Sequence, residues 1–343
     1  MGSTSTCYRC VNRSTGEKFA CKVIEKRNIE KHSQGMSEKI YDEILTLRSL
    51  HHPNIVSIYD FYITDDKIYI VMELMEGGEL FDYVVKKGTL TEDEASEIVR
   101  KVISAVVYMH QKNIIHRDLK PENLMLSREP RSPLDLEVKI IDFGLSKRLE
   151  GPVTHSFLGT RGYLAPEMLQ RREYSRAVDA WALGVIVFVL LCGCLPFDDE
   201  VVSIPSDTDV TQKFHLRFPR WAKNISTSAK DLLSQLLEIN PYKRLTPENA
   251  LDHPWVTGLD IPKNNYLSSP GRIALPKQVR NRNANSPYRH RKPNQQHFIQ
   301  ATAKNYVSHA HANHSAAFVK DNTISTIDAK FTRNPRLQKK ISI

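Results

Sequence analysis

The sequence predicts an α+β protein with two unequal lobes and a tail. Residues 1–75 form a small β-rich lobe with one key helix, residues 76–256 a larger and mainly helical lobe, and residues 257–343 a basic tail. Short β-rich runs dominate before residue 75, helical periodicity dominates after residue 92, and the composition changes after Trp255. With 41% hydrophobic residues in 343, the chain can bury a core of this size.

The first lobe contains three runs rich in β-branched and aromatic residues. They are Lys18 to Val23, Ile55 to Phe61 and Lys67 to Glu73. Between the first two, Ile40, Ile44 and Leu47 recur at the spacing of one helix face. We therefore expect a small sheet with one packed helix. Met75-Glu76-Gly77-Gly78 follows, and its paired glycines suit a hinge between the lobes.

The second lobe begins with apolar residues at helical spacing, including Ala95, Ile98 and Val102. A later uncharged run, Ala180–Phe197, approaches the length of a membrane span, but a glycine and a proline interrupt it. We therefore predict a buried core helix over Ala180–Cys192 and no transmembrane segment.

The net charge of +9 originates in the tail. Residues 259–343 hold 15 Lys and Arg against 3 Asp and Glu, so the preceding residues are slightly acidic overall. Asn, Gln, His and Ser are frequent there and prolines recur, which predicts a disordered tail. We interpret the basic run 280–292 as a solvated linker and expect no nucleic-acid partner. The alternative is contact of this run with nucleic acid, acidic lipid or an import receptor.

The five cysteines are too few and too unevenly spaced for a disulfide framework, and no apolar signal segment precedes them. Cys7 and Cys10 have the spacing of half a zinc site, but no second pair of ligands completes it. These observations favour a cytoplasmic location, with entry into the nucleus as an extension.

Three ordered motifs in the second lobe carry a recognisable chemistry. The segment from His116 to Asn123 matches H-R-D-L-x-x-x-N, Asp142-Phe143-Gly144 matches D-F-G, and Ala165-Pro166-Glu167 matches A-P-E. Phosphoryl transfer requires cations at the phosphates, carboxylate and amide ligands for Mg²⁺, and a base aimed at the attacking hydroxyl. Each tripeptide alone is weak evidence, whereas the ordered set is specific.

Over residues 1–256 the chain resembles the protein kinase superfamily. This resemblance implies a bilobal protein kinase fold and transfer of the ATP γ-phosphoryl group to a protein hydroxyl. It implies that Asp118 is the base that accepts the hydroxyl proton and that Lys120 neutralises the transferring group. Asn123 and Asp142 become the metal ligands, so ATP and Mg²⁺ are the expected cofactors.

The resemblance also implies an ATP-binding set in the first lobe. Lys22 takes the position of the strand lysine that holds the α- and β-phosphates, and Glu43 on the following helix is placed to pair with it. The other implied positions are Gly2, Ser5 and Cys7 in the phosphate loop, Ala20, Met72 and Met125 around the adenine, and the backbones of Glu73 and Met75. For the three apolar side chains near the adenine, a plain core role fits equally well.

The phosphate loop departs from the family pattern G-x-G-x-x-G-x-V. Only Gly2 is retained among the three glycines, Ser5 stands at the third glycine and Cys7 at the valine, and the first strand is missing. We interpret the amino terminus as truncated. The alternative function is therefore a catalytically weak pseudokinase or scaffold with impaired ATP binding, although the lysine, the base and both metal ligands are retained.

The chain is most similar to serine/threonine kinases of the calcium/calmodulin-dependent group, including calcium-dependent and protein kinase D-like branches. Lys120 in the catalytic loop, Gly159-Thr160, Gly77-Gly78-Glu79-Leu80-Phe81 and the segment Leu190–Phe197 carry this resemblance. It implies protein substrates that contain serine or threonine.

Acidic residues predict the substrate preference. Glu79 and Glu122 resemble positions that receive a basic residue upstream of the phosphosite, and Thr160 is expected to contribute to substrate recognition. Ser156 and Thr154 are the candidate phosphosites of the activation loop. Calmodulin is a candidate partner on family analogy alone, because the tail offers only a thin apolar face.

Overall fold

The computed structural model describes residues 5–26, 44–132, 135–143, 147–148, 160–197, 213–269, 273, 316–320 and 323–327. The chain forms two compact units. The sheet unit comprises residues 1–49, 57–74 and 287–343, and the helical unit comprises residues 50–56 and 75–286. The predicted α+β fold class, with a β-rich part and a larger helical part, is confirmed, and the domain bounds stay a prediction.

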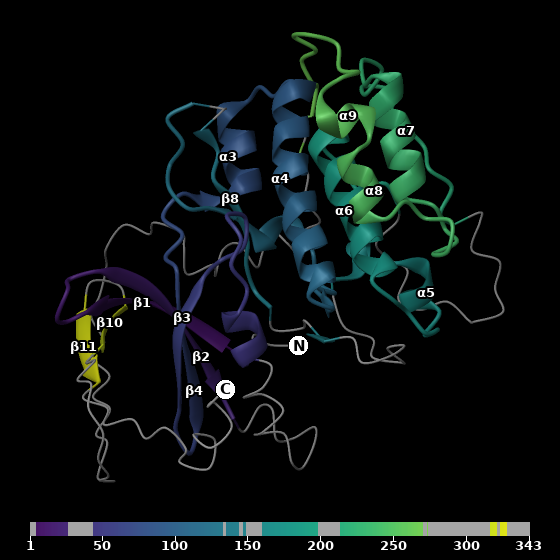
Figure 1. Ribbon diagram of the computed structural model, residues 1–343. Coiled ribbons are helices and arrows are strands. Elements are labelled where there is room, and N and C mark those ends of the chain that lie inside the picture. The colour runs from purple at the N-terminus through teal and green to yellow at the C-terminus, as the bar shows by residue number, and fades with distance from the viewer. Residues whose placement is uncertain are drawn as a thin grey trace. The chain divides into compact units, whose positions relative to one another are not determined.

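The sheet unit is built on one six-stranded sheet (Figure 1). Its strands are β1 (Ser5–Asn12), β2 (Lys18–Glu25), β3 (Ile58–Ile63), β4 (Lys67–Met72), β10 (Ala316–Lys320) and β11 (Thr323–Ile327). Their order in the sheet is β11-β10-β1-β2-β4-β3, and each neighbouring pair is antiparallel. The three predicted runs correspond to β2, β3 and β4, while β1 was not predicted.

The alternation of side chains divides β1, β2 and β4 into two faces. One face carries a buried cluster around Ile68 and Ile70, and Ile44, from the helical stretch 44–48, packs against them. The opposite face carries Cys10 and Cys21, both fully buried beneath tyrosine, phenylalanine and valine side chains. Burial, with a smaller effect of a neighbouring cysteine, raises the pKa of Cys10 to about 11, so this thiol stays protonated and unreactive near neutral pH.

Strands β10 and β11 lie within the segment that the sequence predicts to be disordered. Cα pairing joins Arg9 to Val319 and Asn12 to Ala316 across β1 and β10, and Lys320 to Thr323 across β10 and β11. Over these ten residues the structure therefore differs from the prediction, because pairing with β1 supplies backbone partners that the tail lacks on its own.

The helical unit contains seven α-helices and three short ladders among the described residues (Figure 1). The helices are α3 (Leu80–Lys87), α4 (Glu92–Gln111), α5 (Pro166–Leu169), α6 (Ala177–Cys192), α7 (Thr227–Leu236), α8 (Pro247–Leu251) and α9 (Pro254–Thr257). The short strands are β5 (Gly78–Glu79), β6 (Ile114–Ile115), β7 (Leu124–Leu126), β8 (Val138–Ile140) and β9 (Lys147–Arg148), and η1 (Pro121–Asn123) and η3 (Arg161–Tyr163) are 3-10 turns.

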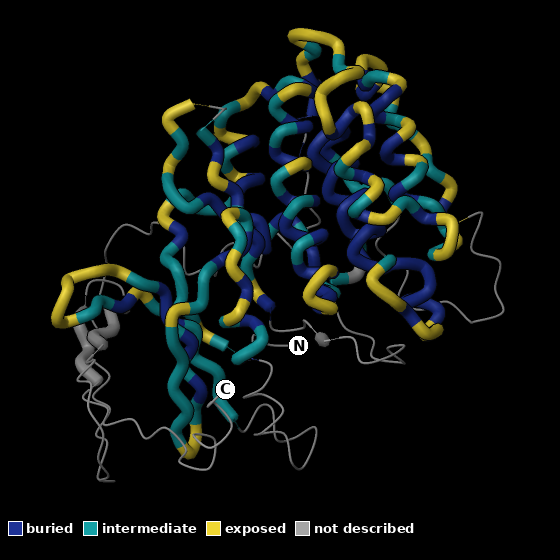
Figure 2. The backbone as a smooth tube through the Cα atoms, viewed as in Figure 1, coloured by how far each residue is buried: buried dark blue, intermediate teal, exposed yellow. Residues whose placement is uncertain are grey.

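Helices α4 and α6 form the centre of this unit. Thr91 caps α4 through a capping box with Glu94, in which each side chain accepts from the backbone N–H of the other residue. Helix α6 is buried from Val178 to Cys192 and ends at Gly193, whose φ of 79° favours glycine. Figure 2 shows this core in dark blue. The predicted buried helix is confirmed, and none of the helices in the described ranges has the length and hydropathy to cross a membrane.

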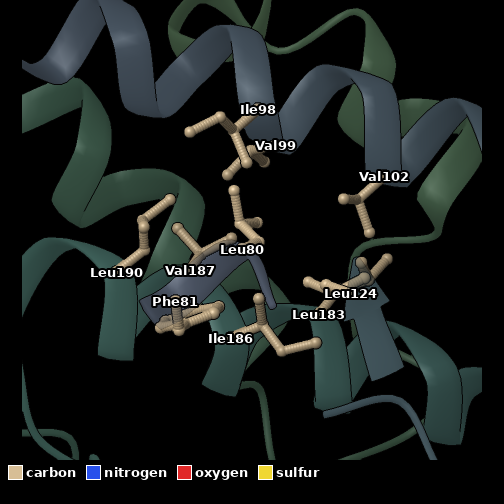
Figure 3. A pocket seen from close by; sticks show the side chains of 10 residues that line it. All are labelled: Leu80, Phe81, Ile98, Val99, Val102, Leu124, Leu183, Ile186, Val187 and Leu190. Carbon is tan, nitrogen blue, oxygen red and sulfur yellow. The ribbon is translucent and has the colours of Figure 1, made fainter. Parts of the chain in front are cut away.

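An apolar cavity lies between α3, α4 and α6 (Figure 3). Its volume is about 10 Å³, room for one water molecule at most. The lining residues are Leu80, Phe81, Ile98, Val99, Val102, Leu124, Leu183, Ile186, Val187 and Leu190. None of them offers a side-chain hydrogen bond, so the cavity is a packing defect and not a binding site.

Two glycines at the start of the helical unit are required by the backbone. A Cβ atom on Gly77 would lie 2.3 Å from the carbonyl oxygen of Arg128, and Gly78 has a φ of 75°. The N–H of Gly77 donates to the carbonyl of Leu126 at 3.0 Å. The paired glycines predicted to be a hinge thus also allow β5 to pack closely on β7.

The chain continues to pack on the helical unit beyond α9. Leu267 N–H donates to Leu90 O at 2.8 Å, Glu92 N–H donates to Asn265 O at 3.0 Å, and the buried Ser269 hydroxyl donates to Leu190 O at 2.9 Å. Residues 265–269 therefore belong to the folded helical unit, although the sequence assigned them to the tail.

Candidate active site

The predicted catalytic loop follows β6 and ends in η1 and β7. Arg117 within it has a φ of 68°, and Asp142, after β8, has a φ of 61°. Residues other than glycine rarely adopt this left-handed conformation, and such strain persists only where surrounding contacts hold it. The contacts of the loop explain how it is held.

Asp179 in the first turn of α6 holds the catalytic loop in place through hydrogen bonds. Its Oδ1 accepts from Arg117 N–H at 2.9 Å, and its Oδ2 accepts from His116 N–H and from His110 Nε2, each at 2.9 Å. The aspartate is completely buried. Burial alone raises the pKa of Asp179, but the hydrogen bond and charge of His110 and the backbone donor outweigh it and hold the pKa below its usual value. An ionised carboxylate thus fixes two consecutive backbone amides.

His116 connects the catalytic loop to the D-F-G segment. Its Nδ1 accepts from Asp118 N–H at 3.3 Å, its Nε2 bonds to Ile141 O at 3.3 Å, and its ring packs on Phe143 with centroids 5.3 Å apart. Burial lowers the pKa of His116, which keeps the imidazole neutral. One neutral tautomer, with the proton on Nε2, satisfies both bonds.

Asp118, Lys120 and Thr160 form one cluster. The Oδ1 of Asp118 accepts from the backbone N–H of Thr160 at 3.0 Å and from its hydroxyl at 3.1 Å, while Oδ2 accepts from Lys120 Nζ. Lys120 Nζ also donates to the Thr160 hydroxyl at 2.9 Å. The structure therefore brings two predicted catalytic residues and a predicted substrate-recognition residue together, with the carboxylate 12% exposed and its orientation set.

Asn123 and Asp142 lie at the ends of the same network. Asn123 Nδ2 donates to Asp118 O at 2.8 Å, and Ile141 N–H, next to Asp142, donates to Asn123 O at 2.9 Å. The side-chain bond uses an amide hydrogen, so the amide oxygen is the group that Asn123 can offer as a ligand. One amide oxygen and one carboxylate suit Mg²⁺, which is commonly held by one or two protein ligands together with substrate phosphates. The donor set fits Mg²⁺.

A buried ion pair supports the A-P-E segment. Arg244 donates to Glu167 through Nη1 at 2.8 Å and through Nη2 at 3.0 Å, and further bonds run to Ala177 O and Ile239 O. The guanidinium also lies 5.0 Å from the ring centre of Trp181. The pair is bidentate, and its two parallel bonds hold Glu167 in place.

The sheet unit carries the predicted ATP-binding residues on one face. Cys7 pairs with Lys22, Ser5 pairs with Ile24, and Ala20 pairs with Met72 in the registers of β1, β2 and β4. Residues opposite one another, and every second residue along a strand, share a face. Ser5, Cys7, Ala20, Lys22 and Met72 thus lie on the same face as the buried cluster around Ile68.

The remaining predicted pocket residues differ in exposure. Met75 and Met125 are buried in the helical unit, where a core role and a pocket role remain compatible with their positions. Glu73 N–H donates to Ser57 O at 2.9 Å, so the backbone group that Glu73 can offer a nucleotide is its carbonyl.

The two acidic positions predicted for substrate recognition lie on neighbouring elements. Glu79 is in β5, Glu122 is in η1, and these elements contact each other. Gly2, Glu43, Ser156 and Thr154 lie outside the described residues.

Comparison with known proteins identifies the family. A family model described as the protein kinase domain matches residues 1–256. Calcium/calmodulin-dependent protein kinase type 1 of Caenorhabditis elegans is 41% identical over 258 residues, which cover 75% of this chain and 72% of that protein. The chain belongs to the protein kinase family.

Two further relatives support the same group of kinases. Calcium/calmodulin-dependent protein kinase cmkA of Emericella nidulans is 43% identical over 251 residues, covering 70% of this chain and 57% of that protein. Myosin light chain kinase A of Dictyostelium discoideum is 41% identical over 258 residues, covering 74% and 84%. The predictions of the kinase fold and of a serine/threonine kinase in the calcium/calmodulin-dependent group are confirmed, and nothing favours the pseudokinase alternative.

The kinase network includes two residues that the sequence did not reveal. His110 in α4 bonds to Asp179, and Tyr174 OH accepts from Arg117 Nη1 at 3.3 Å. A signal existed for His110, because it is a polar residue on the buried face of a helix, next to Met109. No comparable periodicity surrounds Tyr174, whose role depends on the tertiary fold.

Proposed function

We propose that this kinase transfers the γ-phosphoryl group of ATP to serine or threonine hydroxyls of proteins that carry basic residues upstream of the phosphosite. The orientation of Asp118 is the observation that carries the proposal. Its carboxylate accepts three hydrogen bonds from Lys120 and Thr160, and its backbone is held by His116 and Asn123.

Asp118 would act as the base. The bonds from Thr160 restrict the carboxylate to one orientation, which lowers the entropic cost of meeting a substrate hydroxyl. The ammonium group of Lys120 would stabilise the negative charge that develops on the transferring phosphoryl group. It bonds to Asp118, so it lies beside the proposed base, and the Lys120 side chain is 14% exposed.

Separate groups of residues would hold the metal and the nucleotide. ATP supplies the transferable phosphoryl group and Mg²⁺ neutralises the phosphate charge when both are bound. Asn123 and Asp142 would hold the metal through oxygen atoms, and Lys22 would bind the α- and β-phosphates. Ser5 and Cys7, on the face of Lys22, would border the phosphates and the adenine.

The substrate preference rests on Glu79 and Glu122. Carboxylates pair with arginine in bidentate, charge-assisted hydrogen bonds, which discriminate against neutral side chains. The contact between β5 and η1 supports a joint acidic site for arginine three residues before the phosphosite.

Regulation is proposed from the relatives and from the catalytic loop. Several relatives are named calcium/calmodulin-dependent kinases, so calmodulin is a candidate partner of this chain. The guanidinium of Arg117, next to Asp118, would bind a phosphate on Ser156 or Thr154.

A transfer assay with radiolabelled ATP tests the proposal. The wild-type chain should phosphorylate a serine peptide with arginine at position −3, and Asp118→Asn and Asp142→Asn should each lose at least a hundredfold in kcat. Asp252→Asn, a change at an exposed aspartate, is the matched control. Wild-type transfer no greater than that of Asp118→Asn would refute the enzymatic function, and a peptide array without preference for basic residues would refute only the substrate class.

A further inference from the structure

Strand β1 lies between two parts of the chain that are far apart in sequence. On one side β2 pairs with it from Ser5 to Val11, and on the other side β10 pairs with it from Arg9 to Asn12 (Figure 1). Strand β11 then extends the sheet beyond β10. The outer edge of the sheet is therefore formed by the tail and not by β1.

The paired segment differs from the rest of the tail in composition. Residues 316–327 read AAFVKDNTISTI, with one lysine and one aspartate, whereas residues 259–343 as a whole carry five basic residues for each acidic one. Phenylalanine and the β-branched residues Val, Ile and Thr favour strands. An unpaired segment of this kind is an aggregation hazard, and so is an unpaired sheet edge. Pairing of β10 with β1 covers the free edge of β1 and pairs both sides of β10, and the sheet edge moves to β11.

Strand β1 carries both the residues that pair with β10 and two residues of the proposed nucleotide site. Ser5 and Cys7 belong to the same strand as Arg9 and Asn12, and Cys7 is the cross-strand partner of Lys22. A strand that is paired on both sides opens less readily than an edge strand, because its amides and carbonyls have partners on each side.

We propose that β10 and β11 form an intramolecular edge hairpin that holds β1 in the sheet and thereby strengthens ATP binding. The N–H of Asn12 donates to Glu17 O on the β2 side, so by alternation the amides of Arg9 and Val11 face β10. Release of the hairpin exposes these two amides and loosens the strand that carries Ser5 and Cys7. The effect on ATP affinity rests on the proposed function, whereas the pairing itself does not.

Hydrogen exchange on the complete chain tests the pairing. The double variant Phe318→Pro/Val319→Pro removes one N–H donor toward each neighbouring strand, because adjacent residues in a strand direct their amides to opposite sides. The matched control is Ala301→Pro/Thr302→Pro, which places the same two prolines outside both strands. The amides of Arg9 and Val11, which face β10, should exchange at least tenfold faster in the hairpin variant and at the wild-type rate in the control.

A synthetic peptide of residues 314–329 provides the second arm. Added to the hairpin variant, it should restore protection at the amides of Arg9 and Val11. The KM for ATP, raised about threefold or more in the variant, should return toward the wild-type value. Unchanged exchange at these amides in the hairpin variant would overturn the proposal. Protection that appears only at concentrations where a dimer elutes would also overturn it, because the hairpin would then pair between chains.

If the amides exchange faster in the hairpin variant but the wild type has no kinase activity, the proposed function is refuted, whereas the proposed hairpin pairing stands. If the amides exchange faster in the hairpin variant but its KM for ATP equals that of the wild type, the link between the hairpin and ATP binding is overturned. The two failures are therefore distinguishable.

Discussion

Replacement of Asp179 by asparagine should uncouple the catalytic loop from the helical core. The change is nearly isosteric, so it removes charge and one acceptor without creating a cavity. In the structure the two carboxylate oxygens accept three bonds, from Arg117 N–H, His116 N–H and His110 Nε2, all at 2.9 Å. An asparagine has only one oxygen to accept them.

The magnitude follows from the two orientations of the new amide. With its NH₂ group in the Oδ1 position, it faces the N–H of Arg117; in the Oδ2 position, it faces the N–H of His116. Either way a buried backbone donor loses its partner, at a cost of about 1–3 kcal/mol, and the remaining bonds lose their charge assistance. We expect the free energy of unfolding to fall by about 2–4 kcal/mol. Displacement of the neighbouring Asp118 should lower kcat by about 100-fold.

Urea denaturation and the peptide phosphorylation assay measure these two effects. Asp252→Asn has the same chemistry at an exposed position and should change the free energy of unfolding by less than about 0.5 kcal/mol. An Asp179→Asn protein that unfolds within about 1 kcal/mol of the wild type and retains its kcat would show that the three bonds do not hold the loop.

Three further changes test other parts of the structure. Thr160→Val removes the hydroxyl that bonds to the catalytic carboxylate, so kcat should fall by about tenfold or more, whereas Thr160→Ser should retain most activity. Burial lowers the pKa of His116, so the folded state binds fewer protons than the unfolded state, and stability should decline as pH falls below about 6.5. His116→Phe should flatten this decline between pH 7 and pH 5, measured by denaturation, while exposed His215→Phe should not. Val187→Ile should fill the apolar cavity and raise the free energy of unfolding by up to about 0.8 kcal/mol.

Each of these predictions has a result that contradicts it. Equal activity of the valine and serine variants would show that the Thr160 hydroxyl does not orient the base. If the stability of His116→Phe depends on pH as that of the wild type does, the acid sensitivity belongs to other groups. For the cavity, Val106→Ile is the control, since Val106 is buried in α4 but does not line the cavity and should lose about 1–3 kcal/mol by overpacking. Equal losses in both isoleucine variants would contradict the cavity assignment.

The sequence was sufficient for the kinase assignment, for strands β2, β3 and β4 and for the two central helices α4 and α6. Motifs such as H-R-D-L-x-x-x-N depend on residue type and order, which a sequence displays directly. The uncharged run Ala180–Phe197, which Gly193 interrupts, likewise identified α6, because a helix without charged positions on any face must be buried. Strand β1 was missed, because its partly exposed residues lack a strong apolar alternation.

Contacts between distant segments were decided by the tertiary structure alone. His110, Asp179 and the catalytic loop meet only when α4 and α6 pack together, and the bonds of Thr160 to Asp118 join residues from separate segments. The pairing of β10 with β1 is the extreme case. The local composition predicted a disordered tail. A short strand has no stability by itself, so its pairing cannot be read from its own residues, and only the sheet supplies the partners that its backbone requires.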